Sequence, residues 1–260
     1  MKPRFDSPCG AVSARLGIAI AAMVILCSSQ LYAQRHPWSL TASAGMSVLN
    51  LGTVDDDNAA DAEGWAAQGY PVSRFPSLKQ QLLYSMRVSY RYDREFAVSL
   101  LAFYSSKTVQ SAHHSPDDGL DLSRGAGATD IILGIAYYPA ARPYFLEWYV
   151  QATFGLTFAQ ARANAVGFRN VKIAGVPTPE PFVDTDAKFS KTKTSVGAGA
   201  GIEIPVMSRV SINAEAFYRF AQVGAMSGTL TRFGDRTDAT TTIEFNYSGF
   251  LLSTGIRIEL

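Results

Sequence analysis

The segment "HHSPDDGLD", residues 113–121, holds the side chains best suited to chemistry. His113, His114 and Ser115 stand beside several aspartates, and such groups serve elsewhere as metal ligands, general bases and nucleophiles. Pro116 and the aspartates are turn formers, however, and no carboxylate that would orient either histidine is identifiable. The sequence therefore predicts solvated residues at a loop tip, with neither a catalytic site nor a metal site.

Two other segments share features with ligand-binding motifs but lack their requirements. The acidic segment "TVDDDNAADAEG", residues 53–64, would attract calcium, yet it has neither the ligand order nor the central glycine of an EF-hand loop. The segment "GAGAG", residues 197–201, is followed by no lysine and lies inside a strand pattern, so it does not match a phosphate-binding loop. We expect a hydrated acidic loop, a glycine-rich strand and no cofactor.

The N-terminal segment has the organisation of a secretory signal peptide. A basic start is followed by the apolar run "LGIAIAAMVIL", residues 16–26, and cleavage is predicted after Ala33. The run is too short to cross a bilayer, which takes about 20 residues. We therefore divide the chain into a signal peptide, 1–33, and one domain, 34–260. Cleavage would remove Cys9 and Cys27, the only cysteines, and would leave the mature chain without a disulfide.

The overall charge argues against one class of partner. The formal net charge of the 260 residues is +1 at pH 7, and this near balance gives no sign of a nucleic-acid-binding protein.

Beyond the signal peptide the hydrophobic pattern has a period of two residues, which is typical of strands. Several of the segments are about ten residues long, the length that a tilted strand needs to cross a membrane. No segment of useful length has a helical period. Eight strands are predicted, at Trp38–Leu49, Tyr84–Tyr92, Phe96–Ser106, Thr129–Tyr138, Leu146–Phe158, Thr194–Ile204, Val210–Phe220 and Gly249–Leu260.

The connections between these strands alternate in length. Three of them are short turns, "DRE", "PAARPYF" and "PVMSR", and the other four are much longer segments. Short turns on one side and long loops on the other are typical of an outer-membrane barrel with both termini on the short-turn side. From Pro116 onward every proline falls in a predicted loop or turn, as expected because a ladder needs its N–H donors. These prolines are Pro116, Pro139, Pro143, Pro177, Pro179, Pro181 and Pro205.

The two faces of each strand distinguish a membrane barrel from a soluble one. One face is apolar and often aromatic, while the other carries Ser, Thr, Gly and isolated charges, so the apolar face is assigned to lipid. A soluble barrel or sandwich is the alternative. Aromatic residues near the strand ends are expected to form a girdle on the short-turn side: Trp38, Tyr90, Tyr92, Phe96, Tyr137, Phe145 and Trp148.

The charges of the polar face are predicted to meet inside the barrel. An eight-stranded barrel is only wide enough for side chains to fill it, and isolated buried charges are costly. We expect a packed network of ion pairs in the lumen, and a gated conduction path is the alternative. The network is assigned to Arg87, Arg91, Asp130, Glu147, Glu203, Glu215, Arg219 and Arg257.

These patterns together resemble the small outer-membrane β-barrel proteins of the OmpA, OmpX and OmpW type. The resemblance implies an all-β fold: an eight-stranded antiparallel transmembrane barrel with short periplasmic turns and long extracellular loops. It also implies a bacterial outer-membrane location among lipid and lipopolysaccharide. The last strand, Gly249–Leu260, would be read by the barrel assembly machinery, although it ends in Leu260 where such proteins usually have Phe.

The resemblance leaves the task of the protein open. A structural or surface-interaction role with a side-chain-filled lumen and no enzymatic activity is predicted. One alternative is a narrow channel for small solutes. The other is a lipid A-modifying enzyme, because the His-x-Ser spacing of His113 and Ser115 resembles that of outer-membrane lipid A deacylases. Whether extra strands raise the count to ten also stays open.

Overall fold

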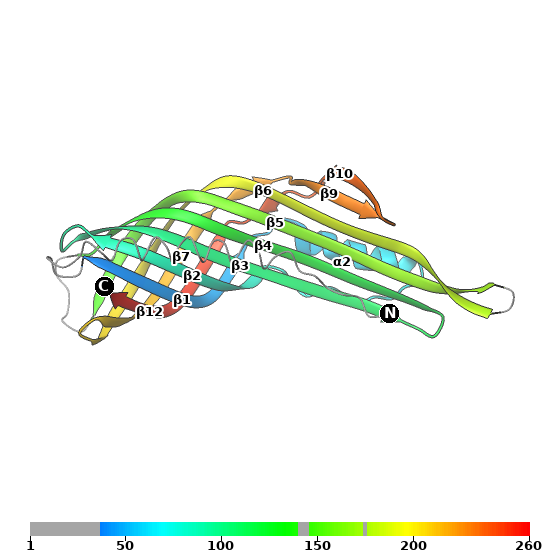
Figure 1. Cartoon of the computed structure of the whole chain (residues 1–260), viewed down its shortest axis with the longest axis horizontal. Coiled ribbons are helices and arrows are strands. Elements are labelled where there is room, and N and C mark those ends of the chain that lie inside the picture. The colour runs from blue at the N-terminus through cyan, green and yellow to red at the C-terminus, as the bar shows by residue number, and fades with distance from the viewer. Residues whose placement is uncertain (1–36, 140–145, 174–175) are drawn as a thin grey trace.

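Eight long strands close into an antiparallel ring (Figure 1). The structure is a computed structural model, and it describes residues 37–139, 146–173 and 176–260; the predicted signal peptide lies outside them. Each strand pairs with the next, and the last pairs with both the first and the seventh, so the eight-stranded prediction is confirmed. The ring consists of β1 (Trp38–Leu49), β2 (Gln80–Arg91), β3 (Phe96–His114), β4 (Asp118–Tyr137), β5 (Glu147–Ile173), β6 (Val176–Met207), β7 (Val210–Phe220) and β12 (Gly249–Glu259).

An apolar belt surrounds the part of this ring that lies nearer the short turns. On β5 the outward residues from Trp148 to Phe158 are all apolar, and the inward residues between them, apart from Tyr149, are small or polar. Ten residue steps of about 3.3 Å, tilted by about 40°, give a belt about 25 Å tall, which matches the hydrocarbon core that an outer-membrane barrel spans. Of the predicted girdle, Trp38 contacts Tyr90 and Phe96 contacts Tyr137, with ring centroids 4.9 Å and 5.2 Å apart. Phe145 lies outside the described residues.

Four strands continue far beyond the belt, and here the sequence prediction was wrong. Segments 107–128 and 159–193 were expected to be long loops, but they extend strands β3–β6. The exceptions are residues 115–117, which connect β3 to β4, and residues 174–175, which lie outside the described residues. We call these two segments the surface sheet. In Figure 1 it is the long curved part that leaves the barrel. It remains regular because its alternation continues: in β5, Ala159, Ala161 and Ala165 face inward, while Gln160, Arg162 and Asn164 face outward.

Four prolines predicted in loops or turns lie in β6 instead. Pro177, Pro179 and Pro181 are two residues apart, so their nitrogens point to the same side of the strand. That side is free, because β9 (Ser227–Arg232) pairs with β6 only at Thr185–Ser190, and an edge strand tolerates missing N–H donors. Pro205 stands where the β6–β7 register shifts.

The acidic segment forms a helix, which also corrects the prediction of a hydrated loop. Helix α2 spans Val54–Ala67, and the face that repeats Val54, Asn58 and Ala62 is buried. Aspartates in its first turn favour the positive end of the helix dipole, and its alanines have high helix propensity. We call residues 68–79, which follow the helix, the strap. The strap contributes Phe75 and Leu78, and the helix contributes Val54 and Ala62, to an apolar cluster that also includes residues of the surface sheet. No helix among the described residues is long and apolar enough to cross a membrane.

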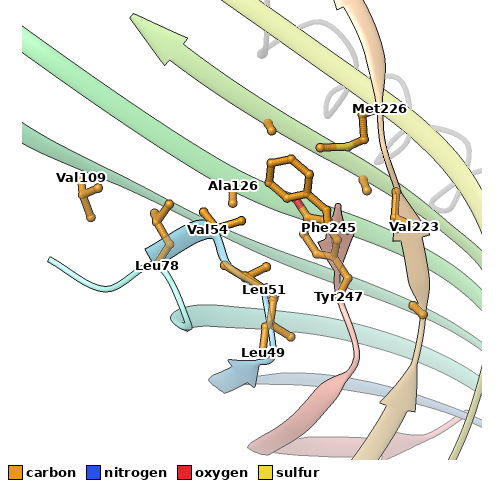
Figure 2. Close-up of a cluster of buried hydrophobic side chains, with 14 of the residues drawn as sticks. Leu49, Leu51, Val54, Leu78, Val109, Ala126, Val223, Met226, Phe245 and Tyr247 are labelled. Atoms are coloured by element: carbon orange, nitrogen blue, oxygen red, sulfur yellow. The ribbon is translucent and has the colours of Figure 1, made fainter. Parts of the chain in front are cut away.

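The segment between β7 and β12 contains four short strands. β8 (Gln222–Gly224) pairs with β11 (Phe245–Asn246), while β9 pairs with β10 (Asp235–Thr240) and with β6. The sheet containing the ring therefore has ten strands, but only eight of them form the ring. Figure 2 shows how Val223, Met226, Phe245 and Tyr247 from this segment gather with Leu51 and Val54 into one buried cluster.

Candidate functional site

The lumen of the barrel is filled by side chains, and β7 shows their order. Its inward positions, from the short-turn end, are Asn213, Glu215, Phe217 and Arg219, all buried. The alternation of the strand places each of them about 7 Å beyond the previous one. Each is in contact with a side chain from another part of the ring, so the lumen is closed at successive levels.

At the level of Glu215 the lumen holds a buried ion pair with a tyrosine. Arg87 from β2 donates hydrogen bonds to Glu215 and to the hydroxyl of Tyr149, which in turn donates to Glu215. Asn213 also donates to the Tyr149 hydroxyl, at 3.0 Å. Because β1 and β12 lie between β2 and β7 in the ring, this cluster bridges strands that are not neighbours.

The next level is aromatic, and a second ion pair lies beyond it. Phe103 of β3 stacks on Phe217, with ring centroids 5.8 Å apart. Arg219 then pairs with Asp130 of β4, and both side chains are only 1% exposed. Arg219 also donates to the backbone carbonyl of Tyr247 at 2.8 Å and 3.0 Å, while Asp130 accepts from Thr157. A charge with this many partners is stable where an unpaired one would not be.

Toward the short turns two further pairs complete the network. Arg257 of β12 pairs with Glu203 of β6, which also accepts a hydrogen bond from Tyr138 at 3.1 Å. Arg91 pairs with Glu147 at 2.9 Å and lies over the Tyr138 ring, 4.2 Å from its centroid. The structure thus places all eight residues of the predicted network inside the ring and brings them together as four arginine–carboxylate pairs.

The sequence did not reveal the uncharged members of this arrangement. Tyr138, Tyr149, Phe103 and Phe217 each link or separate the ion pairs. Phe103 and Tyr149 stand at polar-face positions of their strands, and an aromatic residue on an otherwise polar face is a signal that points to the lumen.

The geometry of the His113 and Ser115 segment does not match a nucleophile with its base. Ser115 lies in the turn between β3 and β4, as predicted, and its hydroxyl donates to Asp118 and accepts from the backbone N–H of Asp118 at 3.1 Å. His113 Nε2 lies 3.4 Å from the same carboxylate. Histidine and serine therefore both contact Asp118 and serve to hold the turn.

Two aspartates of α2, Asp55 and Asp61, are likewise bound by other residues of the protein. Asp55 accepts from the backbone N–H of Leu78 at 3.0 Å and from the hydroxyl of Ser77, and Asp61 pairs with Arg124 at 2.9 Å. Among the described residues no group of three or more His, Cys, Asp or Glu side chains is arranged to hold a metal ion.

Comparison with solved structures identifies the fold. The chain is similar to a major outer membrane protein from Thermus thermophilus, with a TM-score of 0.52 and 10% identity over 85% of this chain and 97% of that one. It also matches OprG from Pseudomonas aeruginosa (TM-score 0.39, 9% identity, 85% and 94% covered). Ail from Yersinia pestis is matched as well (TM-score 0.37, 12% identity, 85% and 99% covered). No protein-family model and no curated protein matches the sequence.

At such identities the similarity concerns the fold alone, and it confirms the resemblance to small outer-membrane barrels at that level. The apolar belt is the physical counterpart of this finding, since only lipid can cover it. The chain accordingly has the fold of an eight-stranded outer-membrane β-barrel.

Proposed function

We propose that this outer-membrane barrel is a non-conducting protein that presents a rigid sheet at the cell surface for contact with other molecules. One observation carries the proposal: side chains fill the lumen, while the strands continue as regular structure outside the belt. A barrel that conducts solutes needs an open interior. Here the interior is crossed by the pairs Arg87–Glu215, Arg219–Asp130 and Arg257–Glu203.

The length and packing of the surface sheet support the contact role. From Phe158 to Ile173, β5 runs 15 steps beyond the belt, or about 50 Å. The strap is tied to this sheet by Lys107, which donates to the Ser77 carbonyl at 2.6 Å, and by Ser111, which donates to Ser73. A surface held in one conformation loses little conformational entropy when it binds, and this favours recognition.

Planar-bilayer recording tests the non-conducting part. The purified protein should give no steady single-channel current, since no level of the lumen is free of side chains. Large, stable current steps from the unmodified protein would contradict the proposal and support the channel alternative.

Single-cysteine labelling on intact cells tests the surface part. Because Cys9 and Cys27 lie in the predicted signal peptide, Lys172→Cys and Ser208→Cys would each give one cysteine in the mature chain. Lys172 lies near the far end of the surface sheet and Ser208 in the β6–β7 turn, and both are exposed. A membrane-impermeant maleimide should label only the first. Labelling of Ser208→Cys alone would mean that the short turns, and not the surface sheet, face the cell exterior.

A further inference from the structure

A groove of about 200 Å³ lies on the outward face of the surface sheet, across β3, β4 and β5. Its floor includes Gly125 and Gly127, where side chains are missing. A β-carbon built on Gly125 would lie 3.2 Å from the Thr108 hydroxyl and 3.8 Å from the Arg162 β-carbon, so these two residues stand on either side of the floor. The other lining residues are Tyr104, Ser106, Lys107, Ala126, Ala128, Thr129, Phe158 and Gln160.

The groove carries a cation without a counter-ion. Arg162 is exposed and makes no hydrogen bond or ion pair with any described residue. The residue directly opposite it on β6 is Lys188, which is another cation. Lys188 bonds Asp186 at 2.6 Å, so the neighbouring carboxylate is occupied. Like charges placed opposite each other destabilise a sheet, and an anion bound between them would relieve this.

The height of the groove identifies the environment that it meets. Tyr104 and Phe158 end the unbroken runs of apolar outward residues that start at the short-turn ends of β3 and β5, and Ser106 and Gln160 are the first polar residues after them. The groove therefore begins where the hydrocarbon ends, at the level of the outer-leaflet headgroups. In a bacterial outer membrane that leaflet consists largely of lipopolysaccharide, whose headgroup at this depth is a phosphorylated glucosamine disaccharide.

We propose that this groove, with Arg162 as its cation, binds the phosphorylated sugar headgroup of lipopolysaccharide. The guanidinium pairs with a phosphate through two parallel hydrogen bonds, and Thr108, Ser106 and Gln160 offer hydrogen bonds to sugar hydroxyls. The acyl chains continue down the apolar belt past Tyr104 and Phe158. The inference goes beyond the proposed function but rests on one part of it, the orientation that places the surface sheet outside the cell, which the cysteine labelling tests separately from lipid binding.

Binding of fluorescent lipid A to the folded protein in non-ionic detergent tests the site. Arg162→Gln should weaken binding of bisphosphorylated lipid A about tenfold, the scale of one charge-assisted contact. Gly125→Leu fills the floor without changing the charge and should weaken it similarly. Lys172→Gln removes a cation ten residues further along β5 and should bind as the unmodified protein does. Heat-dependent gel mobility verifies that each variant is folded.

Two comparisons define what would overturn the proposal. Equal affinity of the unmodified protein and Arg162→Gln for lipid A would contradict the proposal that Arg162 binds a phosphate of the headgroup. Displacement of lipid A by inorganic phosphate alone, at concentrations equal to the lipid's own, would assign the groove to a free anion instead. Weaker binding of monophosphorylated than of bisphosphorylated lipid A is the expected result and supports a phosphate contact.

Discussion

Each buried arginine of the lumen acts as a brace between distant strands. Arg87 joins β2 to β7, Arg219 joins β7 to β4, and Arg257 joins β12 to β6. A backbone ladder holds only neighbouring strands together, whereas these pairs fix the diameter of the ring. Their cost is the loss of hydration, and the tyrosine and carbonyl partners of the charges offset it. The pairs therefore serve shape as much as stability.

A double-mutant cycle on Arg87 and Glu215 tests this pairing. Either alanine substitution alone strands a buried charge and should lower the free energy of unfolding by up to about 3–5 kcal/mol. The double variant should lose clearly less than the sum, because the second substitution removes the stranded charge. Urea unfolding in lipid vesicles measures all three. Arg87→Ala with Asp130→Ala, taken from separate pairs, is the control and should be close to additive; additivity in both cycles would refute the pairing.

Residue types predicted which charges enter the lumen but not which of them meet. The alternation of β2 and β7 places Arg87 and Glu215 on the inner face, and that follows from a period of two alone. Their pairing depends on the tilt and stagger of the closed ring, which local sequence does not specify. Tyr149 was missed for a related reason, since only the closed ring shows that one hydroxyl reaches both charges.

At the scale of the strand, the phase of the alternation changes where the membrane ends. In β5 the apolar residues occupy the outward positions up to Phe158, and from Ala159 to Ala165 they occupy the inward ones. Lipid covers the outer face below this point and water covers it above, so the same rule of burial selects opposite faces. A strand predicted from one continuous phase therefore ends at Phe158, 15 residues before Ile173.

Two arginine substitutions on the same face of β5 test this boundary. Phe154→Arg places a charge near the middle of the belt, where it costs roughly 2–4 kcal/mol, and should reduce the yield of folded barrel in lipid vesicles. Asn164→Arg faces the same way, ten residues further along, and should fold as the unmodified protein does. Heat-dependent gel mobility reports the folded fraction. Equal yields for the two variants would show that Phe154 does not face lipid.

Asp55 of helix α2 holds the far end of the strap by two hydrogen bonds. Asp55→Ala removes the acceptor for the Leu78 N–H and the Ser77 hydroxyl, and should make residues 68–79 more susceptible to limited proteolysis. Asp56→Ala is the matched control, since Asp56 is exposed in the same helical turn and has no such contact. The removal of charge near the helix terminus is the same in both. Similar cleavage rates for the two would mean that the link does not hold the strap.

At the scale of the whole molecule, the barrel and its surface parts share one apolar core. The cluster includes Phe103 and Phe217 in the lumen, Leu122 in the surface sheet, and Val54 in α2 (Figure 2 shows part of it). The lumen is thus covered on the long-loop side by packed side chains. This cover was not predictable from the sequence, because its members come from segments that local pattern assigned to loops.

Several independent levels of closure lead to a specific expectation for conductance. The double variant Arg87→Ala/Glu215→Ala opens one level, but the Phe103–Phe217 stack, the Arg219–Asp130 pair and the apolar cover remain. Because a path conducts only if every level along it is open, this variant should still pass no steady current in a planar bilayer, although it unfolds at lower urea. The matched control is Arg91→Ala/Glu147→Ala, at the short-turn end, which should also stay closed. If the Arg87–Glu215 variant gave stable current steps while the control did not, that one pair would be the gate of a channel, and the barrel would be built to open.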